Sequence, residues 1–129
     1  MIIDTSATIA LVNQEPGYER IERHLATSAA TKIGSPTRLE TGMVLIGHYG
    51  NRGHTMLARF LEKNRIETVS FTHEHAEIAL DAFQRYGKGR HPASLNLGDC
   101  MTYATAHRAR EPLLFVGNDF VHTDLRLLT

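Results

Sequence analysis

Four acidic residues stand where side chains of an α/β protein can do chemistry, and two of them follow apolar runs. Asp4 comes directly after the run 1–3, and Asp119 comes shortly after the run 113–116. Short apolar runs are typical of strands buried on both faces of a parallel sheet. Sites in open α/β sheets lie just beyond the carboxyl ends of such strands. Asp4 and Asp119 are therefore candidate site residues, although Asp4 is also well suited to cap the following helix.

The other two acids belong to predicted helices. Glu40 shares a helix face with otherwise apolar residues, where a carboxylate is costly unless something satisfies it. At the edge of that face it would instead reach solvent. Asp99 lies three residues after Asn96, a spacing that fits a capping box, and directly after Gly98. Glycine there lets the backbone pass close to whatever the acid binds, so Asp99 is suited to both roles.

The four acids would form a cation site if the fold brings them together. Two carboxylates about 4 Å apart repel by about 4 kcal/mol at an effective dielectric constant of about 20. Such a group requires a cation, and an all-oxygen ligand set favours Mg²⁺ or Mn²⁺ over Zn²⁺. Carboxylates that hold Mg²⁺ commonly serve to hydrolyse phosphodiesters, because the metal activates water and offsets the phosphate charge.

The four acidic motifs, taken in order along nearly the whole chain, resemble those of PIN domains. The resemblance is closest to the VapC toxins of bacterial toxin–antitoxin pairs. The motifs that carry it are DTSA at 4–7, LET at 39–41, LGDC at 97–100 and LFVGNDF at 114–120. The resemblance implies an α/β, PIN-like three-layer fold, with a central, mostly parallel sheet between layers of helices.

The same resemblance implies roles for individual residues. Asp4, Glu40 and Asp99 would be the principal catalytic acids that bind Mg²⁺, with Mn²⁺ as a possible substitute, and Ser6 would be a supporting hydroxyl. Many relatives have Thr-x-Asp before the fourth acidic place, where this chain has Gly-Asn-Asp at 117–119. We assign the fourth role to Asp119, with Asn118 as a supporting neighbour; Asp124 is the other neighbour that could share it.

The family cuts RNA, is neutralised by a small VapB antitoxin, and usually forms homodimers and toxin–antitoxin hetero-oligomers. We hypothesise that an antitoxin arginine enters the acidic site, because guanidinium groups bind carboxylates bidentately.

The chain has zero formal net charge, so RNA binding would need a local basic patch. Arg85, Lys88 and Arg90 are the densest candidates, unless they only form a solvated loop.

Two rival functions remain. A phosphatase with an aspartate nucleophile needs a second Asp two residues after the first, where this chain has Ser6. A catalytically silent PIN-like module that binds RNA or protein is the stronger alternative, although the chain keeps all the acids.

Length and composition favour one soluble domain over residues 1–129. Hydrophobic residues make up 42% of the chain, which is ordinary for a globular protein. Apolar runs fall short of the ~20 residues of a membrane span, and strand-like sequence at the start leaves no signal peptide. A single cysteine, Cys100, excludes an internal disulfide and suits the cytoplasm. We predict that it lies in the core.

The pattern of apolar residues predicts strands alternating with helices, hence parallel connections. Ser35 is predicted to cap its helix, with Pro36 in the first turn. Met43 and Met56 are predicted core residues, and Leu80 and Phe83 belong to the apolar face of their helix. The C-terminal residues 117–129 are predicted to be turn-like with an apolar tail. The predicted strands are 1–3, 31–34, 66–70 and 113–116, and the helices 8–13, 18–28, 35–49, 55–64, 72–86 and 97–108.

Overall fold

A computed structural model describes residues 1–128, and its centre is a parallel sheet of five strands. Thr129, the end of the predicted apolar tail, lies outside the described residues. The strands run in the order β3-β2-β1-β4-β5. Their bounds are β1 Ile2–Ile3, β2 Thr31–Gly34, β3 Ile66–Val69, β4 Leu113–Leu114 and β5 Leu127–Leu128.

Strand β1 occupies the middle of the sheet between β2 and β4. Ile3 pairs with Leu114, and Ile2 pairs with both Leu113 and Lys32. The two strands that precede Asp4 and Asp119 are therefore neighbours in the sheet. The sequence pattern missed β5, in which Leu127 and Leu128 pair with β4, because two residues are too few for a periodic signal.

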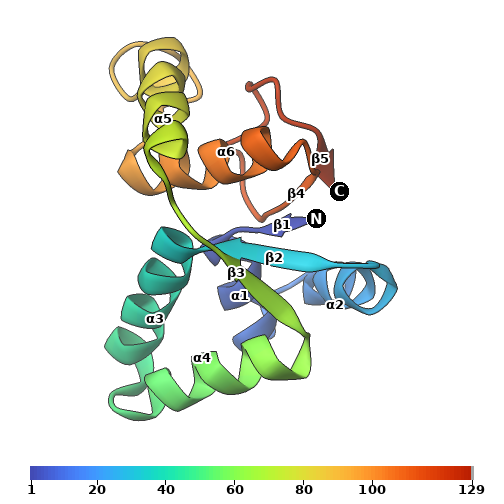
Figure 1. Ribbon diagram of the computed structural model, residues 1–129. Coiled ribbons are helices and arrows are strands. Elements are labelled where there is room, and N and C mark those ends of the chain that lie inside the picture. The colour runs from blue at the N-terminus through green and yellow to red at the C-terminus, as the bar shows by residue number, and fades with distance from the viewer. Residues whose placement is uncertain (129) are drawn as a thin grey trace.

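Helices cover both faces of the sheet, which confirms the three-layer α/β architecture (Figure 1). Ile3 packs with side chains of the first four helices, whereas Ile2 packs with those of the last two, since alternate strand residues face opposite sides. None of the helices within residues 1–128 is long and apolar enough to cross a membrane. The helices are α1 Thr5–Val12, α2 Tyr18–Thr27, α3 Ser35–Tyr49, α4 Arg52–Lys63, α5 His73–Tyr86 and α6 Leu97–Ala109.

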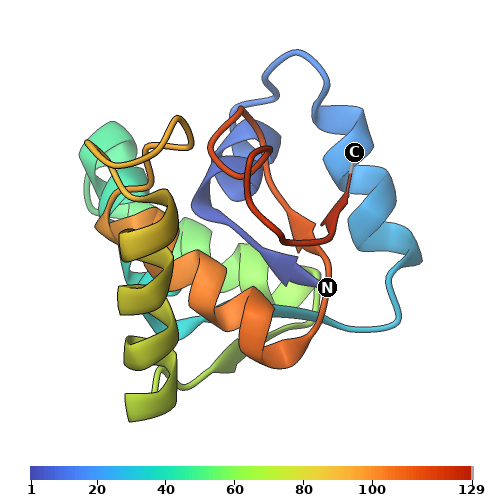
Figure 2. The ribbon, with the colours of Figure 1, turned by 90° about the horizontal axis from the view of Figure 1, so that it is seen from above.

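Helix α6 begins beside α3 and runs toward the start of β4, so its first turn can share a site with residues of α3 (Figure 2). Asn96 and Asp99 form the predicted capping box at that start. The predicted cap of α3 is wrong, because Gly34 occupies the capping position without a side-chain bond and Ser35 is already helical. A β-carbon on Gly34 would lie 2.6 Å from Thr105 Oγ1, so glycine lets α6 pack closely against β2.

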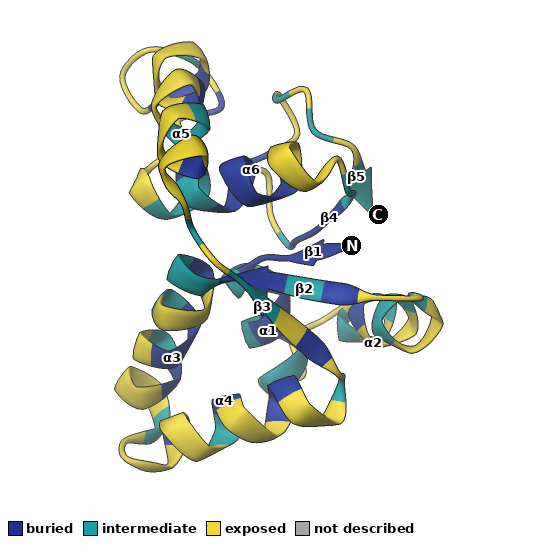
Figure 3. Cartoon of the chain, in the orientation of Figure 1, coloured by how far each residue is buried: buried dark blue, intermediate teal, exposed yellow. Residues whose placement is uncertain are grey.

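The prediction that Met43 lies in the core is wrong. Met43 on α3 is 64% exposed, and Leu80 and Phe83 on α5 are also exposed. Much of both helices is coloured as exposed in Figure 3. Cys100 is buried as predicted, and Met56 packs against the core on the face of the sheet that the first four helices cover. An amphipathic pattern cannot distinguish a face that packs inside its own domain from one left for a partner.

Candidate functional site

Asp4 is a buried carboxylate at the carboxyl end of β1. Its Oδ2 accepts hydrogen bonds from the backbone N–H of Ser6, at 3.0 Å, and from Ser6 Oγ, at 2.6 Å. Its Oδ1 accepts one from Thr102 Oγ1 at 2.8 Å. Asp4 therefore caps helix α1 and also stands beyond the carboxyl end of a central strand, the position from which the sequence predicts a site residue.

Ser6 ties Asp4 to the end of the neighbouring strand. Its hydroxyl donates to Asp4 and accepts from the backbone N–H of Val116 at 3.0 Å. The Ser6 hydroxyl has only one hydrogen, which it donates to Asp4, so toward Val116 its oxygen can only accept. Ser6 thus holds β1 and the segment after β4 together at the site edge.

Glu40 projects from α3 toward the start of α6. Its Oε1 accepts a hydrogen bond from Thr5 Oγ1 at 2.7 Å. Its Oε2 faces the backbone of Gly98 so closely that a β-carbon there would lie 2.4 Å away. Glu40 therefore sits between the helix that follows β1 and the helix that carries Asp99.

Asp99 lies in the first turn of α6, half-buried, and completes the capping box through the backbone N–H of Asn96 at 3.0 Å. Burial raises the pKa of the Asp99 carboxyl to about 6, and the negative charges of Asp119, Asp4 and Glu40 add to that shift. The hydrogen bond from Asn96 opposes it. The other three sequence-predicted acids are therefore near enough to Asp99 to act on its carboxyl electrostatically.

Asp119 lies in the exposed loop between β4 and β5, next to Asn118. The following residue, Phe120, is buried and its ring packs edge-on against Phe115 at 5.5 Å between centroids. Phe120 anchors the loop, so that Asp119 is held at the side of the site where its charge acts on Asp99.

Asp124 is engaged elsewhere. Its Oδ1 accepts a hydrogen bond of 2.6 Å from the Tyr103 hydroxyl, and its Oδ2 pairs with Arg85 at 3.5 Å. Although burial opposes the change, these two partners lower the pKa of the Asp124 carboxyl. Both oxygens are therefore committed to anchoring the C-terminal loop on helices α5 and α6.

The donor set suits a hard divalent cation, since it consists of carboxylates with hydroxyl support. Each of Asp4, Glu40 and Asp99 uses only part of its acceptor capacity inside the protein. Glycine at 98 leaves Glu40 and the start of α6 room to approach each other. Within residues 1–128, however, no three acidic, histidine or cysteine side chains are gathered as a ready-made metal site. The acids would have to draw together around an ion.

Comparison with known proteins decides the family. The sequence profile of the PIN domain matches residues 1–125. The chain belongs to the PIN domain family. It is 47% identical over 126 residues to the protein named ribonuclease VapC36 of Mycobacterium tuberculosis, an alignment that covers 97% of this chain and 91% of that protein. It is 38% identical to the ribonuclease VapC of Mycolicibacterium smegmatis, with 97% of each chain covered.

Solved structures share the PIN fold. The crystal structure of VapC20 of Mycobacterium tuberculosis, described as a sarcin-ricin loop cleaving toxin, matches with a TM-score of 0.77 at 17% identity. That match covers 96% of this chain and 95% of the other. VapBC2 from Rickettsia felis, solved with a DNA fragment from its promoter, matches with a TM-score of 0.72 at 16% identity, covering 98% and 95%.

The basic residues of this PIN domain are partly engaged within the protein. Arg85 pairs with Asp81 and Asp124 and lies over the ring of Tyr86. The guanidinium of Arg90 lies over the Phe83 ring, and Lys88 is exposed in the loop between α5 and α6.

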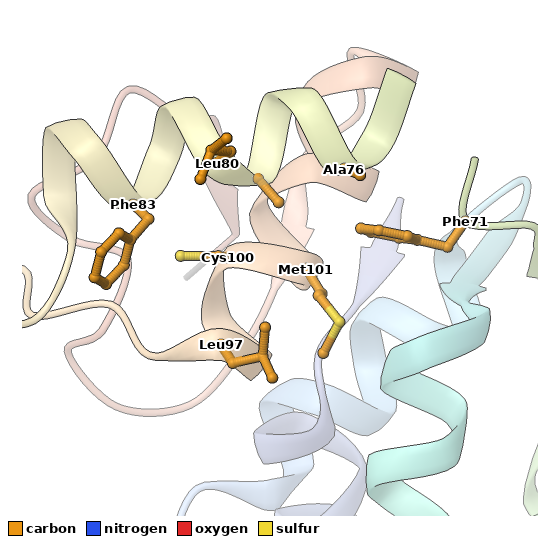
Figure 4. A pocket seen from close by; sticks show the side chains of 8 residues that line it. Phe71, Ala76, Leu80, Phe83, Leu97, Cys100 and Met101 are labelled. Carbon is orange, nitrogen blue, oxygen red and sulfur yellow. The ribbon is translucent and has the colours of Figure 1, made fainter. Parts of the chain in front are cut away.

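An open apolar groove adjoins the acids of the PIN domain. It has a volume of about 650 Å³ and is lined by residues of α3 and the start of α6, including Leu39, Met43, Leu97 and Glu40. A second apolar depression of about 360 Å³ lies between α5 and α6, where Leu80, Phe83 and Leu97 face the same space (Figure 4). The apolar surface therefore runs up to the acidic site.

Sequence reasoning missed the threonines that hold the acids. Thr102 binds Asp4, and Thr5 binds Glu40. Two more, Thr37 and Thr41, contact those threonines from α3. The available signal was the recurrence of threonine within one turn of the acids, although only the fold shows which hydroxyls meet which carboxylates.

Proposed function

We propose that this protein is the toxin of a type II toxin–antitoxin pair and acts as a metal-dependent endoribonuclease that hydrolyses RNA phosphodiester bonds. The observation that carries the proposal is that the charges of Asp4, Glu40 and Asp119 all act on the half-buried Asp99, while Glu40 lies against the start of the helix that carries Asp99. Relatives at 47% and 38% identity are named ribonucleases, which supports the same reaction.

The metal in this proposal is Mg²⁺, with Mn²⁺ as an alternative. Asp4, Glu40 and Asp99 would hold it, with Asp119 directly or through water. Once bound, the metal supplies activation of a water molecule and offsets the negative charge of the scissile phosphate. This ligand set is all oxygen, as Mg²⁺ prefers.

The chain's own residues prepare that site. Ser6 and Thr102 fix the Asp4 carboxylate, while Thr5 orients Glu40. The neighbouring carboxylates make the edge strongly negative, so an RNA phosphate would be repelled until a cation balances the charge. Lys88 and Arg90, on the loop before α6, would attract the RNA backbone beyond the acids.

We further propose a VapB-type antitoxin as the partner, with an apolar segment along the groove and an arginine at the acids. The exposed side chains of Leu39, Met43 and Leu97 supply the apolar part of that surface, and Glu40 stands at its end. An arginine binds carboxylates bidentately and would compete with the metal for the same oxygens. A homodimer, and a hetero-oligomer with the antitoxin, would cover the remaining apolar surface between α5 and α6.

The activity is tested in the cytoplasm of a bacterial host. Expression of the wild type should arrest growth, and co-expression of the antitoxin from the neighbouring small open reading frame should relieve the arrest. The Asp99→Asn variant, expressed to the same level, should leave growth intact. Equal arrest by this variant would contradict a nuclease site that includes Asp99.

A further inference from the structure

Two chains of threonine hydroxyls, the first buried and the second partly buried, lead from helix α3 to the acids. One runs from Thr37 to Thr102 at 3.0 Å and from Thr102 to Asp4 Oδ1 at 2.8 Å. The other runs from Thr41 to Thr5 at 2.9 Å and from Thr5 to Glu40 Oε1 at 2.7 Å. Thr37 and Thr41 are one helical turn apart, so a single face of α3 supplies both chains.

The direction of the first chain follows from counting hydrogens. Each threonine hydroxyl has a single hydrogen, and an ionised carboxylate only accepts. Thr102 gives its hydrogen to Asp4, so Thr37 must donate to Thr102. Thr37 and Thr102 are 3% and 1% exposed, so water has little access to replace either donor. The chain is therefore held in one orientation while Asp4 is ionised.

The chain also selects one oxygen of Asp4. Oδ2 already accepts two hydrogen bonds from Ser6, which fills its two lone pairs. Oδ1 accepts only the bond from Thr102 among the contacts of the described residues, and so keeps a free lone pair. The oxygen that remains able to bind a cation is the one that Thr102 orients.

We propose that Thr102 and Thr37 are positioning residues, which orient Asp4 Oδ1 toward the metal through a relay of two buried hydroxyls. The proposal rests on the proposed function, because it requires that Asp4 bind the metal. Among the hydrogen bonds within residues 1–128, the Thr37 hydroxyl meets no acid directly and acts only through Thr102. Partners that orient metal ligands in this way commonly change metal affinity by about 10–100-fold when they are removed.

The test is the affinity of the full-length protein for Mn²⁺ alone, measured by electron paramagnetic resonance without RNA. Thr102→Val keeps the shape of the side chain and removes the hydroxyl, and we expect it to weaken Mn²⁺ binding by about 10-fold or more. Thr102→Ser restores the hydroxyl and should bind Mn²⁺ within about threefold of the wild type. Thr37→Val should weaken binding by a smaller factor.

The double variant tests the relay itself. If Thr37 acts through Thr102, adding Thr37→Val to Thr102→Val should cause no further loss of affinity. The matched control is Thr105→Val, which removes a buried hydroxyl from the same helix that bonds Met101 rather than an acid. Its Mn²⁺ affinity should equal that of the wild type, whatever its melting temperature.

The failures of the relay and of the metal site can be told apart with Asp4→Asn. If the wild type binds Mn²⁺ and Asp4→Asn abolishes binding, but Thr102→Val binds normally, the relay is wrong and the metal site stands. If Asp4→Asn leaves Mn²⁺ binding unchanged, the proposed metal site is wrong, and the relay with it. Loss of affinity in Thr102→Ser equal to that in Thr102→Val would also overturn the relay, since the hydroxyl would not be the cause.

Discussion

Gly98 approaches Glu40 so closely that a β-carbon at position 98 would lie 2.4 Å from Glu40 Oε2. The contact joins the start of α6, which carries Asp99, to the acid on α3. Two acids from different helices can share a site here because the residue between them has no side chain.

Gly98→Ala should lower the affinity for metal without lowering the stability of the fold. Alanine favours helix over glycine by up to about 1 kcal/mol, so the melting temperature should hold or rise slightly. The new methyl group must displace the end of the Glu40 side chain, and Mn²⁺ affinity should fall about 10-fold or more. Calorimetric melting and Mn²⁺ titration of the same sample measure both. Unchanged metal affinity would show that Glu40 does not need its observed position.

Asp99→Asn should stabilise the metal-free protein at high pH. The pKa of Asp99 in the folded protein is about 6, above its ordinary value of 3.8, so folding favours the protonated form. That stabilisation is complete below about pH 4 and is lost as the pH rises through about 6. In EDTA at pH 8 the variant should therefore be more stable than the wild type by about 1–2 kcal/mol, and the difference should vanish near pH 4.

Urea unfolding at a series of pH values measures this difference. The control is Asp81→Asn, which removes an exposed acid from α5 and should show no comparable pH-dependent gain. A constant difference between Asp99→Asn and the wild type from pH 4 to pH 8 would contradict the raised pKa of Asp99.

Asp119 and Asp124 should behave differently on substitution. Asp124→Asn disturbs the bond from the Tyr103 hydroxyl, so it should lower the free energy of unfolding by about 1 kcal/mol and leave Mn²⁺ affinity nearly unchanged. Asp119→Asn, in an exposed loop, should weaken Mn²⁺ binding with little effect on stability. The reverse pattern would move the fourth acidic role to Asp124.

Met43→Glu should spare the fold and disrupt the antitoxin complex. Met43 is mostly exposed, so the change should alter the free energy of unfolding by no more than about 0.5 kcal/mol. A carboxylate in the apolar groove should prevent the antitoxin from relieving growth arrest. Ala58→Glu, at an exposed site on α4, is the matched control, and the antitoxin should still relieve the growth arrest that this variant causes. If the antitoxin still relieves the growth arrest caused by the Met43→Glu variant, the antitoxin binds elsewhere.

The sequence predicted the sheet and the elements that precede or carry Asp4 and Asp99 because strong local signals mark their ends. The buried runs before Asp4 and Asp119 mark neighbouring strands, and Asn96 with Asp99 marks a helix start. The same approach put Met43 in the core, since the pattern of a helix face does not show what covers it. It also missed the bond between Thr102 and Asp4, which joins residues 98 positions apart. Contacts of that kind depend on how the helices pack.

Metal dependence of RNA cleavage tests the central claim most directly. Purified full-length protein should cleave RNA in Mg²⁺, lose that activity in EDTA, and regain it when Mg²⁺ is added in excess. Asp4→Asn should cleave at least about 100-fold more slowly under the same conditions. Absence of cleavage at every Mg²⁺ and Mn²⁺ concentration would favour a silent binding module. Undiminished cleavage by the wild type in EDTA, or by Asp4→Asn in Mg²⁺, would contradict the proposed mechanism.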